Sequence, residues 1–177
     1  MQMRMLTRLG VLAAAVVVAI AMRPQQVPVV AASPDGKNVF LLTQDGGTVK
    51  WSVKRGSAHV ILPSRLGFVF SGGDSLTDSL SIRTHATRDY DTTFTLPWGE
   101  VRNVRDRHTE LRARIFERGG KAREFDLVVR VYNDGVAFRY DLQSGPNLAS
   151  FTIQDELTEF RFAEDMKAWW APADVPM

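Results

Sequence analysis

Two strands and the turn between them are encoded in the stretch that decides the fold, Phe125-Asp126-Leu127-Val128-Val129-Arg130-Val131-Tyr132-Asn133-Asp134-Gly135-Val136-Ala137-Phe138-Arg139-Tyr140-Asp141-Leu142. On both sides of Asn133-Asp134-Gly135, every second residue is a large apolar one, which is the period of a strand with one buried face. Asp-Gly supplies the positive φ that a tight hairpin turn requires. A sheet with one apolar face must bury that face against a second layer. The stretch therefore predicts half of a sandwich.

The rest of the chain repeats this pattern in shorter pieces, and no stretch is convincingly helical. Short apolar or alternating runs end at turn residues about every ten positions, which is typical of an antiparallel all-β domain. We predict strands at Asn38–Thr43, Thr48–Lys54, Ala58–Leu62 and Leu66–Phe70, and a further strand through Leu111, Ala113 and Ile115. The most polar segments, Ser71–Ser79 and Arg88–Thr93, are expected to be loops. The predicted fold class is an all-β antiparallel sandwich.

Composition limits the classes of function. The chain has 177 residues, of which 45% are hydrophobic and 24% charged, as expected for one folded globular domain. It contains no cysteine. Disulfide scaffolds, cysteine nucleophiles and thiolate metal sites are therefore excluded.

The N-terminus has the pattern of a secretory signal peptide over residues 1–21. Arg4 and Arg8 precede an apolar run from Leu9 to Ala21, and small residues stand at Ala19 and Ala21. The run is about 13 residues long, short of the ~20 that span a bilayer, so we expect no stable membrane span after cleavage. Cleavage removes two of the 22 basic residues and none of the 20 acidic ones, which leaves a balanced charge and no argument for nucleic acid. We expect a periplasmic or secreted bacterial protein, with residues 22–32 as a linker.

The usual catalytic constellations do not occur in the sequence. His59, His85 and His108 stand apart from one another and from acids at metal-ligand spacing, so we expect ordinary surface or strand-face histidines. No Gly-x-Ser-x-Gly motif and no glycine-rich phosphate loop followed by a helix is present. We assign no catalytic residue and no metal ligand.

Acids and indoles near the C-terminus are the best candidates for a site. Glu156 and Glu159 lie close together, and Trp169 and Trp170 follow. Paired carboxylates suit acid/base work on a glycosidic bond or calcium ligation, and indoles stack on sugar rings. We predict that these four residues bind substrate; solvated acids and packed indoles are the alternative. Trp51, on an alternating strand, is expected in the core, and Trp98 is expected to be structural.

A set of phrases, in this order, resembles the N-terminal domain of glycoside hydrolase family 97. They are Ser33-Pro34-Asp35-Gly36-Lys37, Pro63-Ser64-Arg65-Leu66-Gly67, Trp98-Gly99-Glu100-Val101, Asn133–Tyr140, Asp155–Phe160 and Ala168-Trp169-Trp170-Ala171-Pro172-Ala173. The resemblance covers residues 33–177. It implies a β super-sandwich similar to galactose mutarotase, in secreted or periplasmic calcium-dependent α-glucosidases and α-galactosidases. The catalytic carboxylates and most calcium ligands of such enzymes come from a (β/α)₈ barrel.

A barrel of about 250 residues does not fit in this chain. We therefore expect residues 33–177 to form the family's N-terminal domain without the barrel, incomplete at its C-terminal end. A gene fragment and a free-standing module both remain open. Calcium is expected in the full-length family and not on this chain alone.

The resemblance implies a non-catalytic role for this domain in the hydrolysis of α-glycosidic bonds of oligosaccharides. The domain would support the catalytic barrel of the same protein and wall its sugar site, and the chain alone would be inactive. A stand-alone carbohydrate-binding β-sandwich is the alternative. Mutarotase-like epimerisation is a third reading, which isolated histidines disfavour.

Overall fold

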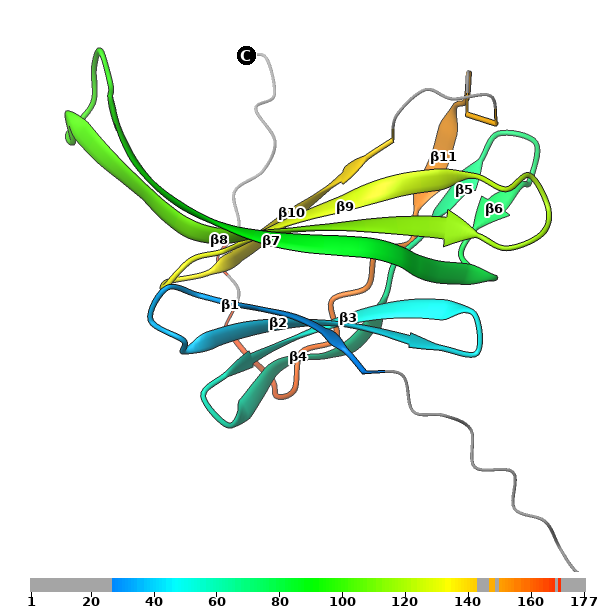
Figure 1. Cartoon of the computed structure of the whole chain (residues 1–177), viewed down its shortest axis with the longest axis horizontal. Coiled ribbons are helices and arrows are strands. Elements are labelled where there is room, and N and C mark those ends of the chain that lie inside the picture. The colour runs from blue at the N-terminus through cyan, green and yellow to red at the C-terminus, as the bar shows by residue number, and fades with distance from the viewer. Residues whose placement is uncertain (1–26, 143–146, 149, 168, 170–177) are drawn as a thin grey trace, which may run out of the picture.

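The computed structural model describes residues 27–142, 147–148, 150–167 and 169. In this part of the chain all regular structure is β, in three antiparallel sheets (Figure 1). The strands are β1 (Val29–Ala32), β2 (Asn38–Asp45), β3 (Thr48–Arg55), β4 (Ala58–Arg65), β5 (Phe68–Phe70), β6 (Ser75–Leu76), β7 (Leu80–Thr95), β8 (Asn103–Glu117), β9 (Glu124–Val131), β10 (Val136–Asp141) and β11 (Ile153–Glu156).

Two four-stranded sheets form the layers of a sandwich. One has the order β1-β2-β3-β4 and the other β10-β9-β8-β7, and a small sheet of order β11-β5-β6 lies beside them at one end (Figure 1). Alternate residues of both layers meet in one core, which includes Phe40 and Trp51 from the first layer and Leu111, Ile115 and Leu127 from the second. Each such side chain contributes about 1.5–3 kcal/mol on burial. The predicted all-β sandwich is confirmed, as is the core position of Trp51.

The decisive stretch forms the predicted β9–β10 hairpin, in which Val136 lies opposite Val131. The turn differs from the prediction, because neither Asn133, Asp134 nor Gly135 has a positive φ. Contacts from elsewhere hold this turn instead: the Asn133 side chain accepts a hydrogen bond from the Asp35 backbone N–H at 3.0 Å. The glycine preference of a primed turn is therefore not used here.

The expected linker over residues 22–32 is wrong at its C-terminal end. Residues 29–32 form β1, which pairs with β2 and buries Val29 and Ala31. Two buried side chains make this short strand part of the core. The sequence does not predict it, because the prolines on either side are typical of a linker. Residues 1–21, the expected signal peptide, lie outside the described residues. Within the described residues, no helix is both long enough and apolar enough to cross a membrane.

A long two-stranded arm is the main difference from the predicted layout. The expected loop at Arg88–Thr93 lies inside β7, which pairs with β8 along its whole length. The pairing of β9 with β8 stops at Thr109, so the distal part of β7 and β8 projects from the sandwich alone (Figure 1). This part has no core to pack against, so it buries no apolar face. Cross-strand ion pairs, such as Arg105–Asp91 at 2.6 Å, lie along the two strands instead. Trp98, expected to be structural, lies at the tip and is 83% exposed.

The expected loop Ser71–Ser79 is correct apart from the two-residue strand β6. The connection from β8 to β9 contains the turn residues Arg118–Lys121. Beyond β11, the segment from Leu157 to Ala163 runs back along β4 and β5, where the Leu62 N–H donates to Arg161 O at 2.7 Å. This segment closes the edge of β4 and contains Glu159, whereas Glu156 is the last residue of β11.

Candidate functional site

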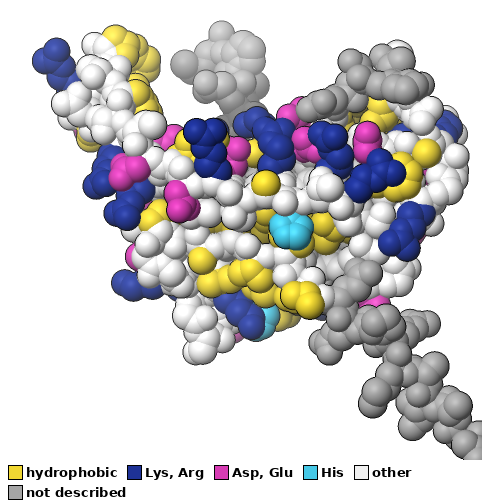
Figure 2. All heavy atoms as spheres, viewed as in Figure 1, with side chains coloured by type: hydrophobic (Ala, Val, Ile, Leu, Met, Phe, Trp, Pro, Cys, Tyr) yellow, Lys and Arg dark blue, Asp and Glu magenta, His cyan; other side chains and the backbone are white. Residues whose placement is uncertain are grey.

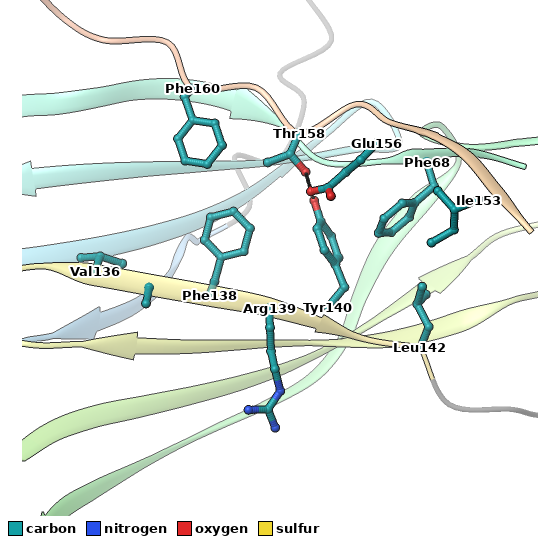
Figure 3. A pocket seen from close by; sticks show the side chains of 11 residues that line it. Phe68, Val136, Phe138, Arg139, Tyr140, Leu142, Ile153, Glu156, Thr158 and Phe160 are labelled. Carbon is teal, nitrogen blue, oxygen red and sulfur yellow. Dashed lines mark hydrogen bonds between the residues drawn. The ribbon is translucent and has the colours of Figure 1, made fainter. Parts of the chain in front are cut away.

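A groove of about 540 Å³ opens at the side of the sandwich, between β10 and the chain from β11 to Phe160 (Figure 3). Strand β10 supplies one wall, β5 contributes to the lining, and the returning segment supplies the opposite wall. The lining residues are mostly apolar or aromatic: Phe68, Val136, Ala137, Phe138, Arg139, Tyr140, Leu142, Ile153, Glu156, Thr158 and Phe160. The groove thus lies between the edge strand of one large layer and the small sheet with the segment that follows it.

Aromatic rings cover the interior side of the groove. Phe138 of β10 stacks on Phe160 of the returning segment, with ring centroids 6.2 Å apart. Both rings meet the edge or face of Trp51 in the core, at 4.9 Å from Phe138 and 5.1 Å from Phe160. Such pairs contribute about 0.5–1.5 kcal/mol beyond area burial. The interior wall of the groove is therefore a continuation of the hydrophobic core.

A chain of hydrogen bonds links β10 to the returning segment. The Thr158 hydroxyl donates its proton to Glu156 Oε1 at 2.6 Å. Because that proton is used, Thr158 Oγ1 accepts the second hydrogen bond, which the Tyr140 hydroxyl donates at 2.7 Å (Figure 3). Burial raises the pKa of Tyr140 to about 12. The phenol therefore stays protonated and acts as a donor rather than a base. This chain joins the two walls of the groove and ends on a carboxylate.

Glu159, in the returning segment, forms an ion pair with Arg65. Its carboxylate accepts from Arg65 Nη2 at 2.7 Å, from Arg65 Nε at 2.9 Å and from the Arg65 backbone N–H at 2.9 Å. The Arg65 guanidinium holds the pKa of Glu159 below its usual value. Glu159 thus fastens the returning segment to the end of β4 and does not line the groove.

The predicted substrate-binding residues do not come together in the described part of the structure. Glu156 lines the groove, whereas Glu159 and Trp169 do not. Trp169 is 94% exposed, and Trp170 lies outside the described residues. Their role in binding sugar stays a prediction.

Sequence reasoning missed the aromatic residues of the groove, Phe138, Tyr140 and Phe160. Phe138 and Tyr140 were assigned to a buried face because every second residue of this stretch is apolar, and that pattern does not distinguish a core from a groove. The position of Phe160 depends on where the chain returns, which no local pattern predicts.

One of the three histidines is buried on the face of a strand. His59 and His85 are exposed, but His108 is buried, and its Nδ1 lies 2.6 Å from Asp106 Oδ1. The imidazole lies between the rings of Tyr90 and Tyr132, with both centroid distances 4.9 Å. His108 therefore anchors the base of the arm.

The outer face of the β10-β9-β8-β7 sheet is a ladder of charges. Asp126 is 3% exposed and accepts hydrogen bonds from Arg114 and Arg112, and the pKa of its carboxyl is lowered chiefly by Arg114. Figure 2 shows basic side chains along this layer with acidic ones between them, and hydrophobic side chains at the tip of the arm. Among the described residues, no three His, Asp or Glu side chains gather as metal ligands.

The fold and the groove define the chain as an antiparallel β-sandwich domain with an open side. The family model described as Glycosyl-hydrolase 97 N-terminal matches residues 31–176. The chain therefore belongs to this family, as an N-terminal domain of glycoside hydrolase family 97.

Curated and solved relatives agree with this assignment. A "Probable retaining alpha-galactosidase" from Streptomyces bingchenggensis (strain BCW-1) is 36% identical over 123 residues, which are 70% of this chain and 18% of that protein. A glycoside hydrolase family 97 enzyme from Pseudoalteromonas sp. strain K8, in complex with panose, is similar with a TM-score of 0.73 and 27% identity. That match covers 76% of this chain and 20% of the solved one. A β-arabinopyranosidase structure has a TM-score of 0.68 and 30% identity, covering 77% of this chain and 21% of that one. The chain thus spans about one fifth of the length of these relatives.

Proposed function

We propose that this domain is a non-catalytic part of a glycoside hydrolase that acts on α-glycosidic bonds of oligosaccharides. Its role is to support a catalytic barrel in the same polypeptide and to wall one side of the sugar site. The observation that carries the proposal is the match of residues 31–176 to the N-terminal family model, combined with coverage of about one fifth of the relatives. The remaining four fifths of such proteins have room for a catalytic barrel.

The acidic residues of the described chain support a structural role. Hydrolysis of a glycosidic bond needs two carboxyl groups on opposite sides of the bond, one acting as acid and one as base or nucleophile. The carboxylate of Glu159 forms an ion pair with Arg65, and that of Glu117 forms one with Arg123. The carboxylate of Asp126 forms ion pairs with Arg112 and Arg114. Of the acidic residues that the structure describes, Glu156 is the one that lines the groove.

Calcium, if the full-length enzyme uses it, would be bound mainly outside the described residues. Within them, the acids near the groove do not form a ligand set, because Glu156 and Glu159 are held by Thr158 and Arg65. A periplasmic or secreted location rests on the N-terminal sequence pattern, and the substrate proposed is an α-glucoside or α-galactoside oligosaccharide.

Genomic sequence downstream of the Met177 codon tests this function. We expect the reading frame to continue for several hundred codons, and its full product to hydrolyse α-galactosides or α-glucosides. A stop codon directly after Met177, together with a well-folded chain that binds no other polypeptide of its operon, would contradict a supporting role.

A stand-alone carbohydrate-binding module is the alternative, and the aromatic groove is the observation that favours it. Its volume of about 540 Å³ and its mixture of Phe138, Tyr140, Phe160 and Glu156 suit a sugar ring and its hydroxyl groups. Calorimetric titration with malto- and galacto-oligosaccharides distinguishes the two functions. Saturable binding that is lost in Phe160→Ala would support the groove, and binding lost in Trp170→Ala would support the C-terminal indoles.

A further inference from the structure

The arm formed by the outer parts of β7 and β8 has two faces of opposite character. The register fixes them, because side chains directly opposite each other on paired strands lie on the same side of the sheet. One face is polar and consists of Asp89, Asp91, Thr93, Arg105, Arg107 and Thr109. Its groups pair with one another: Asp91 lies 2.6 Å from Arg105, and the Thr109 hydroxyl donates to Asp89 at 2.8 Å. The polar face therefore satisfies its charges within the arm.

The opposite face carries the large apolar and aromatic side chains of the arm. They are Tyr90, Phe94, Leu96, Val104 and His108, and we call this side the apolar face. Leu96 belongs to it because its N–H donates to Arg102 O at 2.7 Å and so continues the ladder beyond β7. Phe94 is 48% exposed, and Trp98 at the tip is 83% exposed. Exposed apolar side chains gathered on one face mark an interaction surface.

The apolar face points away from the core of the sandwich. Its β8 residues alternate in step with Arg112 and Arg114 of the outer charge ladder, whereas Leu111 points into the core. Figure 1 shows that the arm bends away from the β1-β2-β3-β4 layer, so the apolar face is the concave side of the bend. The core of this domain therefore does not account for the apolar residues of the arm.

The base of the arm holds this face in a fixed direction. The His108 imidazole lies between the rings of Tyr90 and Tyr132, with both centroid distances 4.9 Å, and its Nδ1 lies 2.6 Å from Asp106. A surface that is already fixed in position loses little conformational entropy when it binds. The outer part of the arm is a two-stranded ribbon, which is only marginally stable alone in water. A contact on the apolar face would stabilise it.

We propose that the apolar face of the arm is the surface on which the catalytic domain of the same polypeptide docks. This inference rests on the proposed function, in which the chain is the N-terminal domain of a longer enzyme. A concave face accommodates a convex neighbouring domain, whereas two concave faces do not close on each other about a two-fold axis. A domain of the same polypeptide is also present at a high effective concentration.

The chemistry of the face defines the surface that it would meet. Phe94, Leu96 and Trp98 require an apolar patch at the centre of the contact. Arg88 stands on the same side as Tyr90, with its guanidinium 5.0 Å from the centroid of that ring, and would meet a carboxylate at the rim. The partner surface is therefore apolar with an acidic edge.

Hydrogen exchange of the arm, compared between the full-length enzyme and the 177-residue chain, tests the proposal. We expect the backbone amides of residues 94–104 to exchange at least about 10-fold more slowly in the full-length enzyme, because docking suppresses local opening. This protection should be independent of enzyme concentration. Equal exchange in the two chains would overturn the proposal. Protection that appears only as the concentration rises would also overturn it, because a second copy would then cover the face.

A pair of adjacent substitutions gives a matched control. Phe94 lies on the apolar face, and Thr93 lies on the polar face opposite Arg105. In the full-length enzyme Phe94→Glu should accelerate exchange of residues 94–104 about 10-fold, whereas Thr93→Glu should leave it unchanged. Equal effects of the two variants would contradict docking through the apolar face. If Phe94→Glu does not yield a folded enzyme, Trp98→Ala at the exposed tip provides the same comparison with Thr93→Glu.

Activity separates this inference from the proposed function. A full-length product that hydrolyses no α-glycoside, but whose arm is protected, would refute the proposed function and support docking. An active enzyme whose arm exchanges as fast as it does in the 177-residue chain would refute docking alone.

Discussion

Replacement of Arg123 by methionine should destabilise the domain more than any surface charge change. Arg123 is 3% exposed and lies in the loop before β9, where its guanidinium bonds to Glu117 at 2.6 and 2.9 Å. It also donates to Asp74 and to Ser75 O, both at 2.8 Å, and lies 5.1 Å from the centroid of the Phe70 ring. One side chain thus joins the large β10-β9-β8-β7 sheet to the small sheet that lines the groove.

The expected magnitude follows from what the substitution leaves behind. The Glu117 side chain is only 11% exposed, so Arg123→Met would leave a buried carboxylate without its partner. Breaking a buried pair in this way costs about 3–5 kcal/mol, a large part of the 5–15 kcal/mol that stabilises an ordinary domain. Arg118→Met, in the same turn but exposed, should change the free energy of unfolding by less than about 0.5 kcal/mol.

The pH dependence has a definite sign. Hydrogen bonds from Arg123 hold the pKa of Glu117 below its usual value of 4.5. A carboxyl with a depressed folded-state pKa contributes stability that is fully present above about 4.5 and is lost as the pH falls through the folded value. The destabilisation caused by Arg123→Met should therefore be largest at neutral pH and should shrink as the pH falls, because burial without Arg123 raises the pKa of Glu117 and its carboxyl becomes neutral in the variant before it does in the wild type.

Urea unfolding followed by circular dichroism measures both effects, at neutral and acidic pH, for the wild type, Arg123→Met, Glu117→Gln and the double variant. The double-mutant cycle isolates the coupling between the two side chains. A loss below about 1 kcal/mol at neutral pH, or a loss that grows as the pH falls, would refute this reasoning.

Three further changes have expected outcomes. Trp51→Ala removes a 3% exposed indole from the aromatic cluster of the groove and should cost about 3–5 kcal/mol, measured by urea unfolding against Trp98→Ala at the exposed arm tip. Gly67→Ala would place a Cβ 2.7 Å from Thr77 Cγ2 and 2.9 Å from Leu76 O, at a φ of +158°, and should cost about 1–3 kcal/mol in thermal unfolding. Glu159→Gln breaks an ion pair whose arginine is 65% exposed, so the loss should stay below about 1 kcal/mol, while hydrogen exchange of the Arg65 amide should accelerate. Equal losses for the two tryptophans, an unchanged melting temperature for Gly67→Ala, or global unfolding of Glu159→Gln would each contradict the corresponding contact.

The sequence predicts those parts of the fold that bury an alternating face. β2, β3, β4 and β9–β10 were predicted because their apolar residues recur every second position. Strand β7 was not predicted, and its outer part at Arg88 to Thr93 was expected to be a loop, because the arm packs against no core and its sequence lacks an alternating apolar pattern. β1 was missed because it is a strand only by virtue of pairing with β2.

The candidate site was predictable only in part. Local spacing singled out Glu156 and Glu159, but it could not show that Arg65, 94 positions from Glu159, holds one of them. Nor could it show that Tyr140 meets Thr158 across the groove, because that contact depends on how the two layers close. His108 looked isolated for a related reason: its neighbour Tyr90 comes from β7, and its neighbour Tyr132 directly follows β9.

A turnover assay of the purified 177-residue chain tests the central claim most directly. The chain, shown to be folded by its circular dichroism spectrum, is incubated with 4-nitrophenyl α-galactoside and 4-nitrophenyl α-glucoside, with and without calcium. A non-catalytic N-terminal domain of family 97 predicts no release of 4-nitrophenol above the buffer rate in any condition. Saturable release that persists through purification and is lost in Glu156→Gln would contradict the account.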